Sequence, residues 1–238
     1  MALKSGIYAI LDIDRLAAAA AVDEDDDVRS QDAEINHVLA YARAAVFADA
    51  CALQLRAKQV PATSLFLRRL YAAVLDEVGH SVAVVMNDHL AAAEAFAGRE
   101  GVGLHLGQDD LSPVTARHHL AAALLGWSTH GADQVAAAQG MPLDYIGFGP
   151  VRSTASKTAV EPTTGFDALS AACAASAIPV VAIGGLGPDD VAAVRAAGAQ
   201  AMAVIGGWLG PQDAPWSPSR AADALAAMVA TWGVGVDR

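Results

Sequence analysis

Short, mostly apolar runs alternate with stretches of helical spacing along the whole chain. Eight runs have the length and composition of buried β-strands: Gly6–Ile13, Ala50–Lys58, Ser81–Asp88, Val102–Gly107, Ala123–Ser128, Tyr145–Val151, Pro179–Gly185 and Ala201–Gly207. Between them, apolar residues recur every three or four positions, which predicts helices at Asp32–Phe47, Thr63–Val78, Leu90–Ala97, Pro113–Leu120, Ala132–Gln139, Phe166–Ala175, Pro188–Gly198 and Ser219–Trp232. The pattern is therefore a repeated strand and helix.

This alternation predicts a parallel sheet covered by helices, because the strands are apolar throughout rather than on every second residue. Eight such units in 238 residues indicate a (β/α)₈ TIM barrel that forms one domain over residues 1–238. A doubly wound open sheet is the alternative. It is disfavoured because no Gly-x-Gly-x-x-Gly follows the first strand and no Walker-type lysine motif occurs. The acidic segment at about 20–30 is expected to be a solvated insertion, and a helix at about 219–232 closes the chain.

Composition limits the partners that such a barrel could have. The net charge is −11 and 54% of the residues are hydrophobic, which describes a folded chain with an ample core. An acidic surface argues against nucleic acid and against anionic membranes, since both need a basic patch. The sequence shows neither a membrane span nor a signal peptide pattern, so we expect a cytoplasmic protein and leave a homo-oligomer open. Cys51 and Cys173 are expected to be reduced packing residues.

Three polar residues, Gln54, Arg56 and Lys58, are spaced by two in the second predicted strand. Their side chains therefore share one face, and the intervening residues are Leu53, Leu55 and Ala57. Because the leucines should face the helices, the polar residues are predicted to face the barrel interior and its mouth. Two cations placed there are costly unless they meet an anion. The alternative is that they splay onto surface loops.

Oxygen ligands follow the next two strands. Asn87 and Asp88 end the third strand, and Asp109 and Asp110 follow the fourth. At the C-terminal ends of barrel strands these groups would lie beside the cations, and carboxylates suit Mg²⁺ that shares phosphate oxygens of a substrate. Taken singly, each aspartate could instead be a helix cap.

Hydroxyl groups and a lysine follow the fifth and sixth strands. Ser128 and His130 end the fifth, and the loop after the sixth carries Thr154, Ser156 and Lys157. Two donors and a cation favour an anion as the ligand, although a plain solvated loop would fit this stretch alone.

Glycine pairs end the last two strands, Gly184-Gly185 and Gly206-Gly207, and no charged side chain accompanies them. They fit a phosphate held by backbone N–H groups, as barrels often hold one after strands 7 and 8. His105 alternates with Gly103 and is expected to pack or to hydrogen-bond inside the barrel.

Taken in order, these motifs resemble the thiamine-phosphate synthase family. The resemblance runs from Tyr8 to about Leu209, through Gln54–Lys58, Asn87-Asp88, Leu104–Asp110, Ser128–His130, Gly149–Lys157 and Ala182–Gly185. Each motif is weak by itself, whereas the ordered set is specific. The chain departs from the family pattern at Ala57, at Ser156 and at Gly206, where the family usually has a serine.

The resemblance implies Mg²⁺-dependent transfer of the pyrimidine group from its diphosphate to thiazole phosphate, with release of pyrophosphate. It implies pyrimidine diphosphate binding by Gln54, Arg56, Lys58, Asn87, Ser128 and Lys157, of which Lys157, Arg56 and Ser128 would act in catalysis. It implies Mg²⁺ ligands at Asp88 and Asp110, and thiazole phosphate binding by Thr154, Ser156, Gly185, Ile205 and Gly206. Catalysis would be electrostatic, without a covalent intermediate.

Two other functions remain compatible with the sequence. A thiazole tautomerase on a similar barrel would use a histidine such as His130 for proton transfer and would need no diphosphate site. A non-catalytic barrel could bind thiamine phosphate as a sensor or carrier, with Ala57 and Gly206 as traces of lost activity. The polar residues of the second strand together with the carboxylate pair favour the synthase, because an isomerase has no need of them.

Overall fold

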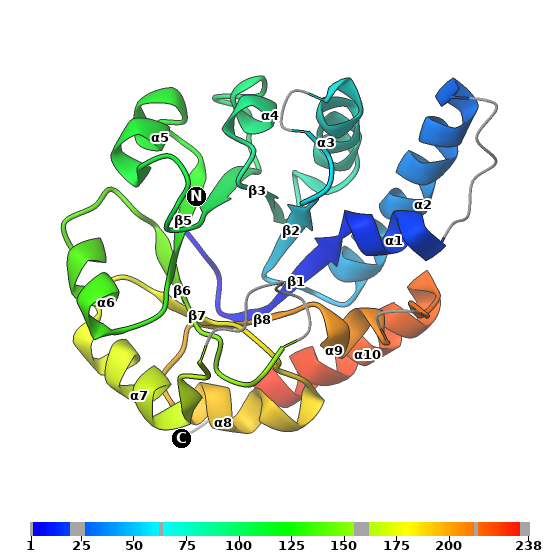
Figure 1. Ribbon diagram of the computed structural model, residues 1–238. Coiled ribbons are helices and arrows are strands. Elements are labelled where there is room, and N and C mark those ends of the chain that lie inside the picture. The colour runs from blue at the N-terminus through cyan, green and yellow to red at the C-terminus, as the bar shows by residue number, and fades with distance from the viewer. Residues whose placement is uncertain (1, 20–26, 62–63, 155–161, 212–213, 234–238) are drawn as a thin grey trace.

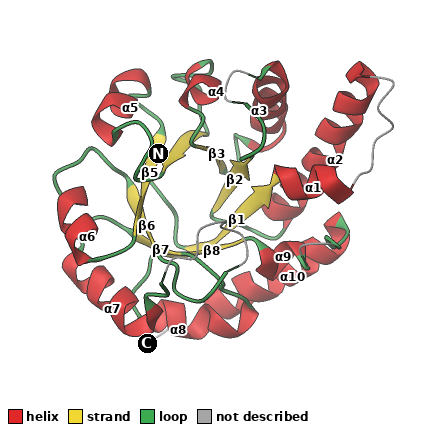
Figure 2. Ribbon diagram, in the orientation of Figure 1, coloured by secondary structure: helices red, strands yellow, loops and turns green. Residues whose placement is uncertain are grey.

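Eight parallel strands close into a single barrel in the computed structural model, which describes residues 2–19, 27–61, 64–154, 162–211 and 214–233 (Figures 1 and 2). The strands are β1 (Gly6–Asp12), β2 (Ala52–Arg56), β3 (Ala83–Asn87), β4 (Val102–Leu106), β5 (Leu124–Thr129), β6 (Tyr145–Phe148), β7 (Val180–Ala182) and β8 (Ala201–Val204). Each pairs with the next in the chain, and β8 pairs with β1. The predicted TIM barrel is confirmed, and the open sheet is excluded.

Helices surround the barrel (Figure 2). They are α1 (Ile13–Ala19), α2 (Asp27–Phe47), α3 (Leu65–Val78), α4 (Leu90–Glu94), α5 (Pro113–His119), α6 (Ala132–Ala138), α7 (Gly165–Ala175), the 3-10 helix η1 (Pro188–Asp190), α8 (Val191–Ala196), α9 (Gly206–Leu209) and α10 (Pro218–Gly233). The expected C-terminal helix is present as α10. Among the described helices, none has both the length and the apolar character that crossing a membrane would need.

Two short helices were not predicted. The residues directly after β1, for which no element was predicted, form α1, and the last strand ends at Val204, so that Gly206 begins α9. The segment expected as an acidic insertion lies partly outside the described residues, at 20–26. Its remaining part, from Asp27, is already the first turn of α2 and is therefore not an irregular loop.

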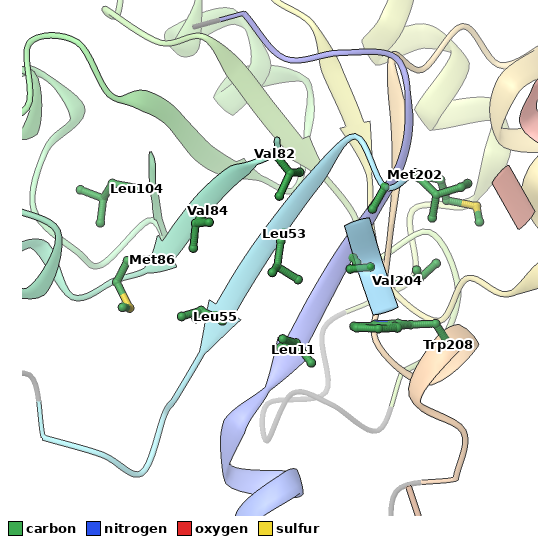
Figure 3. Close-up of a cluster of buried hydrophobic side chains, with 14 of the residues drawn as sticks. Leu11, Leu53, Leu55, Val82, Val84, Met86, Leu104, Met202, Val204 and Trp208 are labelled. Carbon is green, nitrogen blue, oxygen red and sulfur yellow. The ribbon is translucent and has the colours of Figure 1, made fainter. Parts of the chain in front are cut away.

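The two faces of the strands bury different side chains. Outward-facing residues such as Leu11, Leu53 and Leu55 form the larger apolar cluster, in which Trp208 of α9 also lies (Figure 3). The inward face is lined by a second cluster that includes Tyr8, Ile10, Ala52, Val85, Leu124 and Tyr145. Since polar residues share this inward face with the second cluster, the barrel can carry a site at its open end.

Candidate functional site

The end of β2 delivers two polar side chains into the barrel, as the two-residue spacing predicts. Gln54 is buried, and its Nε2 donates a hydrogen bond to the hydroxyl of Tyr8 at 3.0 Å. Arg56 pairs in register with Asp12 on β1, and its Nη1 donates to Asp12 Oδ2 at 2.6 Å. Lys58 lies beyond the strand, half exposed at the mouth.

Two carboxylates meet at the same mouth. Asp88 follows β3 directly, and Lys58 Nζ donates a hydrogen bond to its Oδ2. Asp110 follows β4, and its Oδ2 accepts the N–H of Gly107 at 2.7 Å. Burial raises the pKa of Asp110 above its ordinary value, and the hydrogen bond with Asp88 and the negative charge of Asp88 raise it further. The two carboxyl groups therefore lie close to each other at this mouth.

Neither aspartate is a helix cap. The N-cap of α4 is His89, and the N-cap of α5 is Ser112, whose Oγ accepts the N–H of Thr115 at 3.2 Å. The structure also distinguishes between Asp109 and Asp110. The sequence left open which of the two lies beside Asp88. Asp110 is the one that lies against Asp88, whose hydrogen bond and negative charge raise the pKa of Asp110.

This carboxylate pair fits a hard divalent cation. Across the described ranges, no three His, Cys, Asp or Glu side chains gather as a complete metal site. Asp88 and Asp110 supply two anionic oxygen groups, and the Lys58 ammonium already lies against one of them. A Mg²⁺ ion commonly binds through one or two carboxylates, with water and substrate phosphates as its other ligands. The pair suits an ion that arrives together with a phosphorylated substrate.

The centre of the site is built from β3, β4 and β5. Asn87 is the buried last residue of β3. Ser128 lies on β5, where its Oγ is 3.0 Å from Nε2 of His105 on β4. Gln108 Nε2 donates to the backbone oxygen of Ser128. His105 thus hydrogen-bonds inside the barrel, as predicted.

The loops after β6 and β7 lie against each other on the other side of the mouth. The N–H groups of Val151 and Arg152 donate to the oxygens of Ile183 and Gly184, each at 2.9 Å. Gly185 has a φ of 65°, and a Cβ there would lie 2.2 Å from the oxygen of Ser153, so only glycine permits this contact.

Gly206 stands in different surroundings. A Cβ at Gly206 would meet no atom within 4 Å, so this position would accept the serine that is usual in the family. The residue follows Ile205, the N-cap of α9, and its open surroundings leave room for a ligand.

The predicted lysine and one hydroxyl cannot be placed. Ser156 and Lys157 lie outside the described residues, which stop at Thr154 in this loop and resume at 162. Thr154 itself is partly buried. The loop leaves β6 at the mouth, beside the end of β7, so its start is consistent with the predicted position.

Sequence reasoning missed the carboxylates that hold the site's arginines. Asp12 pairs with Arg56, and Asp190, on η1, binds Arg152 Nε through its Oδ1 at 2.7 Å. Asp12 shares the inward face of β1 with Tyr8 and Ile10, so alternation along that strand could have indicated it. Asp190 lies 38 residues from its partner, and no spacing rule would find it.

Comparisons with known proteins point to one family. The family model for thiamine monophosphate synthase matches residues 28–207. A thiamine-phosphate synthase of Anaeromyxobacter dehalogenans is 41% identical over 178 residues, which cover 74% of this chain and 77% of that protein. A thiamine-phosphate synthase of Moorella thermoacetica is 38% identical over 173 residues, 72% of this chain and 80% of that protein.

A solved structure with a similar fold is thiamine phosphate pyrophosphorylase from Pyrococcus furiosus. Its TM-score is 0.70 over 95% of this chain and 98% of that one. At 21% identity this likeness speaks for the barrel alone. The family model and the sequence relatives carry the assignment further, and on their strength the chain belongs to the thiamine monophosphate synthase family.

Proposed function

We propose that this chain transfers a hydroxymethylpyrimidine group from its diphosphate to the ring nitrogen of a thiazole phosphate, with Mg²⁺, releasing thiamine phosphate and pyrophosphate. The observation that carries the proposal is the meeting of Arg56, Lys58, Asp88 and Asp110 at one mouth. A leaving diphosphate needs cations and a metal site at one place. An acidic chain that gathers its cations there has an arrangement suited to this reaction.

The residues divide into three groups in this proposal. The pyrimidine diphosphate is bound by Gln54, Arg56, Lys58, Asn87, Ser128 and Lys157. The thiazole phosphate is bound by Thr154, Ser156, Gly185, Ile205 and Gly206. The metal is held by Asp88 and Asp110. The family pattern supports these roles, and the opposed positions of the β2–β5 ends and the β6–β7 loops are consistent with two separate anion sites.

The reaction breaks the bond between the pyrimidine's methylene carbon and the diphosphate oxygen, and the electron pair leaves with the diphosphate. Arg56 and Lys58 meet the growing negative charge, while the aminopyrimidine ring spreads the positive charge left on carbon. The thiazole nitrogen then donates its lone pair to that carbon and forms the new C–N bond. No side-chain nucleophile is needed, so the chain acts by position and charge.

Charge balance supports the need for a metal. At the β2–β4 ends of the mouth, the described cations Arg56 and Lys58 are paired with Asp12 and Asp88, and Asp110 lies beside Asp88. With all of them ionised, these five side chains cannot neutralise a diphosphate. Mg²⁺ held by Asp88 and Asp110 would supply the missing positive charge. Lys58, which lies against Asp88 at the same mouth, would supply a further positive charge to the diphosphate.

The test is to incubate purified protein with both phosphorylated halves, with Mg²⁺ and with excess chelator. We expect thiamine phosphate and pyrophosphate in equal amounts with the metal and at least a hundredfold less product with the chelator. Isomerisation of the thiazole without coupling would contradict the proposal in favour of a tautomerase. Binding of thiamine phosphate with no product under any condition would contradict it in favour of a carrier.

A further inference from the structure

A continuous line of hydrogen bonds crosses the barrel interior beneath the mouth. Gln54 Nε2 donates to the Tyr8 hydroxyl at 3.0 Å, which lies 2.9 Å from the Tyr145 hydroxyl. The Tyr145 hydroxyl is 3.0 Å from Nδ1 of His105, and Nε2 of His105 is 3.0 Å from Ser128 Oγ. The line therefore connects two proposed substrate-binding residues, Gln54 on β2 and Ser128 on β5. It runs through Tyr8, Tyr145 and His105, which the proposed reaction does not use.

The surrounding barrel makes room for this line. A Cβ at Gly126 would lie 2.1 Å from Tyr145 Cζ, so the tyrosine ring occupies the space that any side chain at position 126 would fill. A Cβ at Gly147 would lie 3.2 Å from His105 Cε1. The rings of His105 and Tyr145 stack, with centroids 5.5 Å apart and planes 23° apart. The line is therefore a packed part of the barrel core.

The chemistry of the three middle groups ties the two ends together. Each tyrosine hydroxyl has one proton to donate, and a neutral imidazole has one N–H and one acceptor nitrogen. The hydrogen-bond neighbours of the Tyr8 hydroxyl among the described residues are Gln54 and Tyr145. If Gln54 donates to Tyr8, the Tyr8 proton is therefore left for Tyr145, the Tyr145 proton for Nδ1 of His105, and the His105 proton, on Nε2, for Ser128. Every bond in the line then points the same way.

We propose that Tyr8, Tyr145 and His105 are positioning residues that fix the hydrogen-bonding polarity of the site. With Nε2 of Gln54 committed to Tyr8, its Oε1 is left to accept from the ligand. With Ser128 Oγ accepting from His105, the Ser128 hydroxyl is left to donate. The pair selects a heterocycle edge with an amino N–H beside a ring nitrogen acceptor, an inference that rests on the proposed function for the identity of that ring.

The linkage explains why an inverted edge would be rejected. A pyrimidinone presents an oxygen acceptor and a ring N–H donor, the opposite of the aminopyrimidine edge. To match it, Gln54 would have to turn its amide, and all three middle groups would have to reverse their protons together. A site without the line could turn Gln54 and Ser128 independently of each other. Removing the Tyr145 hydroxyl should therefore loosen the selection.

The direction of the line is tested by ¹⁵N NMR of the histidine-labelled protein at neutral pH, with His105 assigned by its absence in His105→Gln. We expect the Nε2–H tautomer, with Nδ1 shifted by its hydrogen bond from Tyr145. In Tyr145→Phe the Nδ1 resonance should move towards the value of a nitrogen that accepts no hydrogen bond. An Nδ1–H tautomer, an imidazolium, or no change in Tyr145→Phe would overturn the proposal.

The selection is tested by kcat/KM with the aminopyrimidine diphosphate and with its 4-oxo analogue. Tyr145→Phe should lose at least tenfold in kcat/KM for the amino substrate, chiefly through KM, and its preference over the analogue should shrink at least tenfold. Tyr71→Phe is the control, because the Tyr71 hydroxyl is equally buried but bonds the backbone oxygens of Val84 and Gly103. It should lose stability and keep the preference.

The two experiments separate failure of this inference from failure of the proposed function. Wild-type preference in Tyr145→Phe would overturn the inference while the synthase activity stands. If the unaltered protein makes no product, the proposed function fails, and the tautomer of His105 still decides whether the line has the direction inferred.

Discussion

Asp88 holds a left-handed backbone conformation, with a φ of 64°, immediately after β3. Aspartate and asparagine tolerate this conformation better than other non-glycine residues. Asp88→Asn therefore removes the charge without straining the chain. We expect kcat to fall by about a hundred- to a thousandfold, because one preorganised charge is worth roughly 2.7–4 kcal/mol at such a site. The measurement is kcat at saturating Mg²⁺ and substrates, with the melting temperature beside it.

Asp109→Asn is the matched control for this substitution. It is adjacent to Asp110 in sequence and exposed, and the substitution makes the same charge change. It should keep kcat within a factor of about three. Near-normal turnover in Asp88→Asn, or equal losses in the two variants, would remove Asp88 from the proposed metal site.

At the residue scale, the sequence predicted side chains whose face follows from strand periodicity. Gln54 and Arg56 turn inward because the apolar residues between them turn outward. It did not predict that Arg56 is held by Asp12, because that contact depends on the register of a different strand. Nor could spacing choose between Asp109 and Asp110, which are adjacent in a loop. Contacts across elements need the three-dimensional structure.

At the scale of elements, the loop after β6 is fastened to η1 by Arg152. Its guanidinium lies over the Phe166 ring and binds Asp190, whose other oxygen accepts the N–H of Gly187 at 3.1 Å. This contact holds the loop that leads to Thr154 against the loop of Gly185. The proposed thiazole phosphate site therefore depends on a contact between two loops that are far apart in sequence.

Asp190→Asn removes the ion pair with Arg152 and keeps a side-chain oxygen that can accept the N–H of Gly187. We expect KM for thiazole phosphate to rise about tenfold, with a smaller change in kcat and in KM for the pyrimidine diphosphate. Stability should fall by about 1–2 kcal/mol, since one charge-assisted hydrogen bond is reduced to a neutral one. Steady-state kinetics with each substrate varied in turn separates the effects.

Asp189→Asn provides the comparison, because Asp189 is adjacent to Asp190 in sequence and its side chain is exposed. It should leave both KM values unchanged. If KM rises for both substrates equally in Asp190→Asn, then the ion pair supports the whole barrel rather than the phosphate side of the mouth.

Elements with strong hydrophobic periodicity were predicted well, and elements too short to show a period were missed. All eight strands were found, because each is apolar on both faces. Except in β5, their C-terminal ends were placed too late, notably at Ala201–Gly207, since Ile205 and the two glycines continue the composition of β8. Helix α9 has four residues, too few for a 3.6-residue period to show.

At the scale of the whole molecule, the barrel buries several groups that could lose a proton at high pH. Both cysteines are free, as predicted, and burial raises the pKa of Cys51 to about 12 and that of Cys173 to about 11. Burial also raises the pKa values of the Tyr8 and Tyr145 hydroxyls above their ordinary range. In the unfolded chain these groups return to values of about 8.5 for cysteine and about 10 for tyrosine.

The folded barrel should therefore lose stability as the pH rises above about 8.5. Between the unfolded and folded pKa values, the unfolded chain has released a proton that the folded chain still holds, so each group lowers the free energy of unfolding by up to about 1.4 kcal/mol per pH unit. The cysteines act first, and the tyrosines join near pH 10.

Urea unfolding from pH 7 to 10 should show this slope, and Cys51→Ala combined with Cys173→Ala should flatten it between pH 8.5 and 10. Each single variant should remove about half of that change, because the folded-state pKa values of both thiols lie above pH 10. An unchanged slope in the double variant would mean that neither thiol is held protonated by burial, and that the alkaline loss comes from elsewhere in the barrel.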